Sequence, residues 1–82
     1  MMNTGDNQTS LLNLADGQRG VIVAILGGRG ASKRLADLGL STGAEIQVIG
    51  RTLFSGPVQI EAGGSRWVIG RGLAAKIMVE LI

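Results

Sequence analysis

The spacing of hydrophobic positions along the chain changes within residues 34–51, where a helical period gives way to a strand-like alternation. Leu35 and Leu38 are three residues apart, so they share one face of a helix. Ser32 is a suitable N-cap for that helix. Gly39 stands where helices commonly end on a residue in the left-handed conformation. The spacing therefore predicts a short helix that starts near Ser32 and ends before Gly39.

The chain after this helix turns twice before it becomes a strand. Leu40 follows the helix at the position where an apolar contact back onto the last turn is common. Gly43 then allows a second tight turn. From there the side chains alternate, with Ile46 and Val48 on one side and Glu45, Gln47 and Ile49 on the other. This period of two predicts a half-buried strand.

The rest of the chain reads as short strands separated by glycine-rich turns. The run over 20–26 is apolar on both faces, so it is either a central strand or a strand covered by the helix. An alternating strand begins after the turn-forming Gly56 and Pro57, and the glycines at 63 and 64 predict a two-residue hairpin turn after it. Further expected elements are a strand over 66–69, a single helical turn near 73–75 and a last strand over 77–81. Five or six short strands with one brief helix predict a mainly β protein, a small closed or partly open barrel.

Residues 1–10 are mostly polar and have short side chains. Such a segment cannot bury enough apolar area to offset the entropy lost on ordering. We therefore expect a disordered tail over 1–10 and a single ordered domain over 11–82.

The composition removes most catalytic and structural-metal chemistry. The 82 residues contain no cysteine and no histidine, so disulfides, thiol nucleophiles, imidazole bases and the usual zinc ligands are missing and no enzymatic activity is expected. No apolar run approaches the ~20 residues of a membrane span, which predicts a cytoplasmic protein that does not insert into a membrane. Phe54 and Trp67 are the only aromatic residues, so the core must be aliphatic. Trp67 is either a plug of that core or an anchor at an interface.

The charged residues are few. Eight basic and six acidic residues give a net charge of +2, which is weak support for nucleic acid binding. Arg29, Lys33 and Arg34 put three positive charges around the predicted helix and its glycine-rich approach. That approach lacks the spacing of a phosphate-binding loop, so nucleotide binding is not expected. The acidic residues lack the spacing of a dedicated metal site; those considered are Asp16, Asp37, Glu45, Glu61 and Glu80.

The order of these motifs resembles the FeoA family, the small protein A of bacterial ferrous-iron transport. The resemblance is carried by the leucines and glycines of 11–21, by RLADLGLSTGAEIQVI from Arg34, by GPVQIEAGG from Gly56 and by the terminal A-x-I-x-V. The matched positions are Arg34, Leu35, Leu38, Gly39, Leu40, Gly43, Gly56, Pro57, Ala75, Ile77 and Val79. Many members have a basic residue where this chain has Gly70, and Arg71 is the nearest substitute.

This resemblance implies an SH3-like barrel with the helix between the first two core strands. It also implies a non-enzymatic adaptor that assists FeoB, the large membrane permease with a GTP-hydrolysing cytoplasmic domain, and that requires no cofactor. We place the docking face on the helix and its flanking loops. Arg29, Lys33, Arg34 and Arg71 would steer the encounter, and Leu40 or Phe54 would make apolar contacts.

The resemblance also leaves an alternative function open, because the same module occurs as the C-terminal domain of iron-dependent repressors. In that case the chain would be a metal-responsive regulatory domain. It would act by self-association into a homo-oligomer or by transient binding of Fe²⁺, or of Zn²⁺ as its surrogate. Only Asp and Glu side chains are available as ligands, and no particular set of them is assigned.

Overall fold

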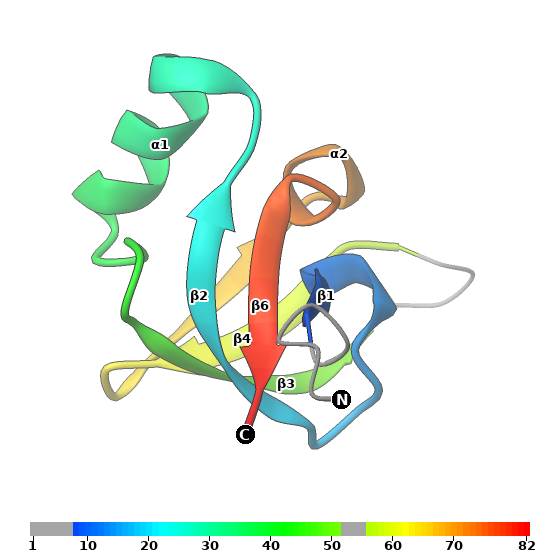
Figure 1. Ribbon diagram of the computed structural model, residues 1–82. Helices are drawn as coiled ribbons and strands as arrows, with labels where there is room; N and C mark the ends of the chain where they lie inside the picture. The colour runs from blue at the N-terminus through cyan, green and yellow to red at the C-terminus, as the bar shows by residue number, and fades with distance from the viewer. Residues whose placement is uncertain (1–7, 52–55) are drawn as a thin grey trace, which may run out of the picture.

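The computed structural model describes residues 8–51 and 56–82, which form one antiparallel six-stranded sheet with two helices (Figure 1). In chain order the elements are β1 (Gln8–Ser10), the 3₁₀ turn η2 (Leu11–Asn13), β2 (Arg19–Ile25), α1 (Gly28–Asp37), β3 (Glu45–Arg51), β4 (Val58–Ala62), β5 (Ser65–Ile69), α2 (Arg71–Ala74) and β6 (Ile77–Leu81). The mainly β prediction is confirmed, and α1 lies between β2 and β3 as expected.

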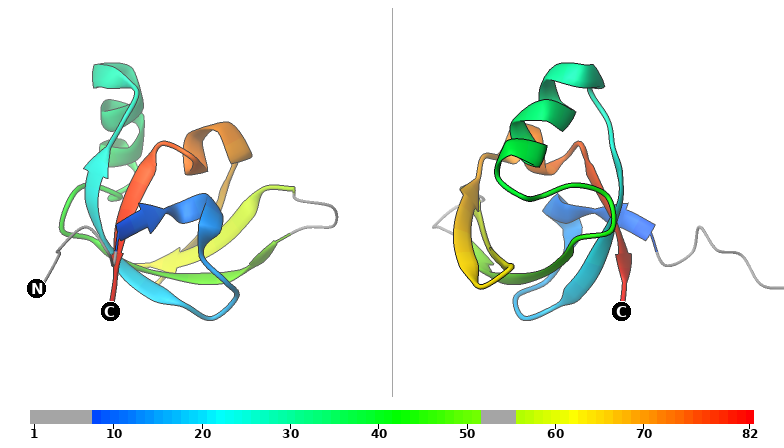
Figure 2. Two further views of the ribbon diagram at one scale, coloured as in Figure 1. Left: turned by 45° about the vertical axis from the view of Figure 1, so that its right-hand side comes forward. Right: turned by 90° about the vertical axis from the view of Figure 1, so that its left-hand side faces the viewer.

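The strands follow the order β1-β6-β2-β3-β4-β5, so β2 is a central strand and β1 and β5 are the two edges. Figure 2 shows that the sheet curls around the core and that α1 stands over one end of it. The pairing shifts by one residue at two places, between Ile22 and Ala24 on β2 and between Val48 and Gly50 on β3. Such bulges bend strands and increase their twist, which explains the strong curl of so short a sheet.

The core is entirely aliphatic among the described residues. It draws on every strand except β1, on η2 and on both helices. The buried side chains are Leu11, Leu14, Ile22, Leu35, Leu40, Ile46, Val48, Val58, Ile60, Ile69, Ala74, Ile77 and Val79. Trp67 is half-buried and packs against this cluster. The alternation predicted for 45–49 is confirmed, because Ile46 and Val48 are buried while Glu45 is exposed.

The two-residue hairpin turn is also confirmed. Gly63 and Gly64 both have positive φ, at 60° and 82°, and they join the paired residues Ala62 and Ser65. Positive φ at both central positions is the requirement of a type I′ turn. This turn fixes the register of β4 against β5, and therefore which backbone groups of β5 face outward.

The disordered tail predicted over 1–10 is wrong for its last three residues. Gln8–Ser10 forms β1 and pairs antiparallel with β6. A polar segment gains order here because its backbone hydrogen bonds extend an existing sheet, which needs little apolar burial of its own. The first seven residues of the predicted tail lie outside the described residues.

The start of α1 differs from the prediction as well. The helix begins at Gly28, with Gly27 as its N-cap at a φ of 94°, whereas Ser32 lies inside the helix. The first N–H groups of a helix have no intrahelical partner, so weak helix formers are tolerated there. The glycines that sequence reasoning assigned to a loop instead supply the sharp entry into the helix and its first turn.

The end of α1 is the predicted left-handed cap. Gly39 has a φ of 84° and donates to the carbonyl of Ala36 at 2.9 Å, while the N–H of Leu40 donates to the carbonyl of Leu35 at 2.8 Å. These two bonds complete a Schellman motif, in which the residue after the glycine folds back against the last turn. Leu40 is therefore buried, and Leu38 is left 40% exposed.

Replacing Gly39 with Ala should lower the free energy of unfolding by about 1 kcal/mol, because an L side chain is strained at this φ. Urea unfolding followed by the fluorescence of Trp67 would measure the loss. Gly30→Ala is the matched control, since Gly30 lies inside α1 with open space at its Cβ position. The control should gain up to about 1 kcal/mol. Equal effects of the two changes would contradict the role given to the cap.

Candidate functional site

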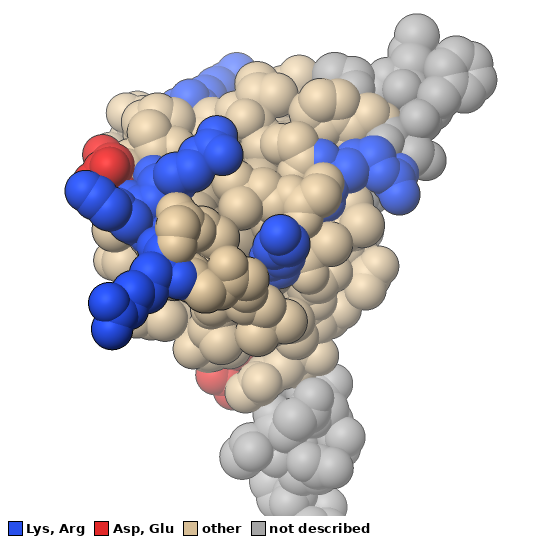
Figure 3. Space-filling view, turned by 90° about the horizontal axis from the view of Figure 1, so that it is seen from above, with Lys and Arg blue, Asp and Glu red and all other residues tan. Residues whose placement is uncertain are grey.

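Basic side chains gather on the helical part of the molecule. Arg29, Lys33 and Arg34 are exposed on α1, Arg71 is exposed on α2, and Lys76 is exposed in the turn after α2. Asp37 is the one acidic residue on these elements. Figure 3 views this end from above and shows the basic groups spread over it around uncharged surface, with acidic groups only at the margin. We call this surface the helical face.

The strands and turns have the opposite balance among the side chains that the structure describes. Arg19 and Arg66 are outnumbered by four acidic residues, namely Asp16, Glu45, Glu61 and Glu80. The chain is therefore polarised although its net charge is only +2. Such a separation of charge orients an approaching partner more than the net charge would suggest.

The glycine-rich approach to α1 is anchored beneath Lys76. The N–H of Leu26 donates to the carbonyl of Lys76 at 2.7 Å. A Cβ at Gly27 would come 2.8 Å from Cδ of Lys76, so the lysine stem lies close over this loop. The contact holds the first turn of α1 beside the turn after α2, and it brings cations from two distant parts of the sequence onto one face.

A groove runs beside the helical face, between the C-terminal half of α1 and strand β5. One hollow of about 330 Å³ lies toward α2 and is lined by Arg34, Leu35, Asp37, Leu38, Val68, Ile69, Gly70 and Leu73. A second hollow of about 450 Å³ lies toward the hairpin and is lined by Leu38, Gly39, Ala44, Glu45, Ala62, Gly63, Ser65 and Trp67. Leu38 borders both hollows, and we call the two hollows together the β5 groove.

The β5 groove exposes apolar side chains beside the cations. Leu38 is 40% exposed and Val68 is 65% exposed, and both border the hollow that Arg34 also lines. A well-packed apolar contact surrounded by charged groups is the usual composition of a protein interface. This face therefore has the composition of a docking surface.

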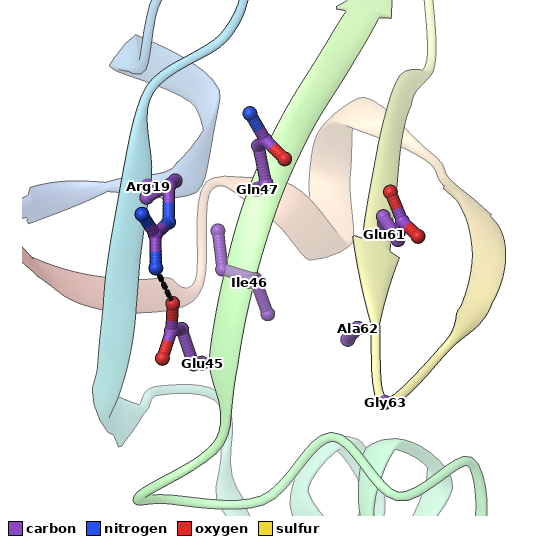
Figure 4. Close-up of a pocket in the computed structure, with 7 residues that line it drawn as sticks. All are labelled: Arg19, Glu45, Ile46, Gln47, Glu61, Ala62 and Gly63. Carbon is purple, nitrogen blue, oxygen red and sulfur yellow. Dashed lines mark hydrogen bonds and ion pairs between the residues drawn. The ribbon is translucent and has the colours of Figure 1, made fainter.

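A second depression, on the sheet, has a different character. Figure 4 shows Arg19 of β2 paired with Glu45 of β3, with Gln47 farther along β3 and Glu61 across from them on β4. The hollow measures about 500 Å³. Both members of the ion pair are more than half exposed, at 55% and 52%, so the pair adds little stability. It is a solvated polar surface.

No group of three or more potential metal ligands occurs within 8–51 and 56–82. The acids named from the sequence therefore form no such group in these ranges, and Glu45 is already paired with Arg19. Neither α1 nor any other helix in these ranges combines the length and hydrophobicity that crossing a bilayer requires.

The structure brings together most of the residues predicted for docking. Arg29, Lys33, Arg34 and Arg71 all lie on the helical face. Leu40 is wrong as a partner contact, because it is 1% exposed and belongs to the core. Phe54 lies outside the described residues.

Two residues of the groove were missed by sequence reasoning, Leu38 and Val68. The signal for Leu38 was present, since a Schellman cap pairs the residue after the glycine with the residue three positions inside the helix. That rule selects Leu40 and Leu35 as the buried pair and leaves Leu38 outside. The sequence offers no comparable signal for Val68. It stands between Trp67 and Ile69 in a run that is apolar throughout, so no contrast with polar residues shows which side chain is exposed.

The chain matches known proteins along most of its length. A family model described as the FeoA domain matches residues 9–81. A relative from Methanocaldococcus jannaschii named "Putative Fe(2+) transport protein A" is 43% identical over 65 residues, covering 79% of this chain and 77% of the relative. The crystal structure of an iron uptake regulatory protein (FeoA) matches with a TM-score of 0.83 and 40% identity, covering 92% of this chain and 97% of that one. The expected SH3-like fold is confirmed by this match.

A third match extends the fold to a different class of protein. A manganese-dependent transcriptional repressor matches with a TM-score of 0.82 at 21% identity, covering 92% of this chain and 42% of the repressor. At this identity the likeness concerns the fold alone. The chain thus corresponds to less than half of the repressor's length.

Proposed function

The chain belongs to the FeoA family, and we propose that it is a non-enzymatic accessory protein of ferrous-iron uptake that docks on the cytoplasmic part of a FeoB-type permease. The observation that carries the proposal is the helical face, where five basic side chains lie beside an exposed apolar groove. The name of the archaeal relative supports a place in Fe²⁺ transport. The absence of histidine and cysteine from the sequence supports a role in binding rather than in catalysis.

Docking would proceed in two steps. The cations of the helical face act over about 8 Å at physiological ionic strength, so they orient the chain toward an acidic surface of the permease before contact. The apolar β5 groove then provides the short-range contact that slows dissociation. Arg34 takes part in both steps, because it lies on α1 and also lines the groove.

Charge reversal of the helical face should weaken docking by about tenfold or more. The change is Lys33→Glu combined with Arg34→Glu, both at exposed positions of α1. Binding would be measured with the purified cytoplasmic region of the permease, at low and at physiological salt. The variant should lose most of the salt dependence as well as the affinity, because the steering charges are gone.

The control for this experiment is Arg19→Glu, which reverses a charge away from the helical face. Arg19 belongs to an exposed ion pair, so its replacement should cost little stability. Undiminished binding of the Lys33 and Arg34 variant would remove the docking assignment. The double reversal changes the net charge by four units and the control changes it by two. A control that lost about half as much binding free energy as the double variant would therefore show that the net charge matters and that the face does not.

The alternative, a metal-responsive regulatory domain, is supported by the shared fold with the manganese-dependent repressor. The acidic side chains within the described ranges do not gather into a group of three, so no particular metal site follows from their positions. The basic helical face and the adjoining apolar groove support docking, and for that reason we prefer it.

A further inference from the structure

Strand β5 is an edge strand whose outer backbone groups can be identified from its register. Within the described part of the chain β5 pairs with β4 on one side and with no strand on the other. Ala62 and Ser65 flank the two-residue turn, so they exchange hydrogen bonds, and the pattern then alternates along the ladder. Trp67 and Ile69 therefore bond toward β4. The N–H and C=O groups of Arg66 and Val68 point away from it.

The β5 groove runs along this same open edge. Trp67 lines the hollow toward the hairpin, and Val68 and Ile69 line the hollow toward α2. Leu38, at the C-terminal end of α1, borders both hollows. The edge thus combines outward-facing backbone groups with two adjoining apolar hollows, which is the arrangement that a sheet uses to accept an extra strand.

The positive charge beside the edge favours a different protein over a second copy of this chain as the molecule that binds there. Arg66 stands on β5 itself, and Arg34 borders the hollow toward α2. Pairing of β5 with β5 of a second copy would bring two cationic helical faces close together, which costs electrostatic energy. An acidic segment is attracted to the same place. Asp37 and Glu45 also border the groove, but Glu45 is already paired with Arg19.

We propose that the edge of β5 binds an extended segment of the partner protein as an added antiparallel strand. The inference rests on the proposed docking function and names its mode. The segment carries two apolar side chains two residues apart, one for each hollow, flanked by acidic residues that meet Arg34 and Arg66. Alternate residues of a strand lie about 6.6 Å apart on one face, which suits two hollows that share Leu38 as a border.

The geometry specifies which amide of the segment is needed. Residues that face the hollows lie opposite Trp67 and Ile69, so their own N–H groups point away from β5. The residue between them lies opposite Val68 and exchanges hydrogen bonds with it. Methylation of that central nitrogen should abolish binding, whereas methylation at either apolar residue should be tolerated.

The test is titration of the ¹⁵N-labelled chain with the blocked peptide Asp-Asp-Thr-Leu-Thr-Leu-Thr-Asp-Asp, followed by NMR. The amides of Leu38, Arg66 and Val68 should shift, and exchange of the Arg66 and Val68 amides with solvent should slow by tenfold or more. The same peptide N-methylated at the central Thr should lose these effects, and the peptide N-methylated at the first Leu should keep them. Weak binding is sufficient, since NMR detects dissociation constants near 1 mM, about 4 kcal/mol.

Protein variants supply the second arm. Leu38→Glu places a charge between the hollows and should remove the shifts, while Leu26→Glu changes another exposed leucine, 51% exposed and outside the groove, and should not. Absence of shifts with about 5 mM peptide would overturn the proposal, as would equal binding of both methylated peptides. Protection of the β5 amides in the free protein as its concentration rises would show that a second copy is the occupant instead.

Failure of this mode is distinguishable from failure of docking itself. If Leu38→Glu still binds the cytoplasmic region of the permease while the Lys33 and Arg34 variant does not, docking stands and strand addition is wrong. If neither change affects that binding, the docking assignment is wrong regardless of the peptide result.

Discussion

Leu35→Ala should lower the free energy of unfolding by about 3 kcal/mol, within the range of about 2–5 kcal/mol for buried leucines. Leu35 is 0% exposed and is the one fully buried residue that α1 contributes. Its carbonyl also accepts the hydrogen bond from Leu40 that closes the helix cap. The change therefore removes the main packing contact between α1 and the sheet. In a domain whose total stability scales to about 4–12 kcal/mol, such a loss is large.

Urea unfolding, followed in parallel by far-ultraviolet circular dichroism and by the fluorescence of the single tryptophan, measures this effect. Leu38→Ala is the matched control, because it removes the same atoms from the same helix at a residue that is 40% exposed. The control should cost less than about 1 kcal/mol. Similar losses in the two variants would mean that α1 is not attached through Leu35. If Leu35→Ala does not fold, Leu35→Val should still show a smaller loss of the same sign.

The sequence predicted the elements better than the side chains that they expose. Period-two alternation located β3 and β4, and paired glycines located the hairpin, because both signals are local and depend on backbone geometry. The edge strand β1 could not be found in this way. Gln8–Ser10 is polar and is ordered by pairing with β6, which lies at the other end of the chain.

The docking residues divide along the same line. The exposure of Arg29, Lys33 and Arg34 could be predicted, because cations near a helix remain exposed wherever the helix packs. Their role in docking stays a prediction. The exposure expected of Leu40 was wrong, since Leu40 belongs to the core and Leu38 is at the surface. A three-residue spacing treats Leu35 and Leu38 as equivalent, and only the cap geometry shows which leucine turns inward. The role given to Val68 in the groove depends on β5 being an edge strand, which is a property of the whole sheet and not of the local sequence.

The second large effect is expected at Gly20, a buried residue of β2 that pairs with Ile46 on one side and Leu81 on the other. A Cβ at this position would lie 2.2 Å from Cγ1 of Val79 and 2.9 Å from the carbonyl oxygen of Glu80. Val79 is β-branched and 0% exposed, so it has no alternative rotamer space into which to move. We expect Gly20→Ala to cost about 2–3 kcal/mol by overpacking.

The sign of this change is informative, because alanine in place of glycine inside a strand would otherwise gain about 0.5–1 kcal/mol. Gly50→Ala provides that reference, since Gly50 lies in β3 with open space at its Cβ position. Urea unfolding of the two variants should give effects of opposite sign or, at the least, a difference above 2 kcal/mol. A neutral Gly20→Ala would mean that β2 and β6 approach each other less closely than their pairing indicates.

A double-mutant cycle identifies the neighbour that is responsible. Val79→Ala alone should be destabilising, because it opens a cavity in the core. Combined with Gly20→Ala, it also removes the clashing Cγ1 atom, so the pair should be more stable than the sum of the two single changes by about 1 kcal/mol or more. Additive losses would instead assign the strain to the carbonyl of Glu80, which no side-chain change can relieve. The close approach of β2 to β6 at Gly20 would then be a limit set by the backbone, and β2 would accept no residue larger than glycine there.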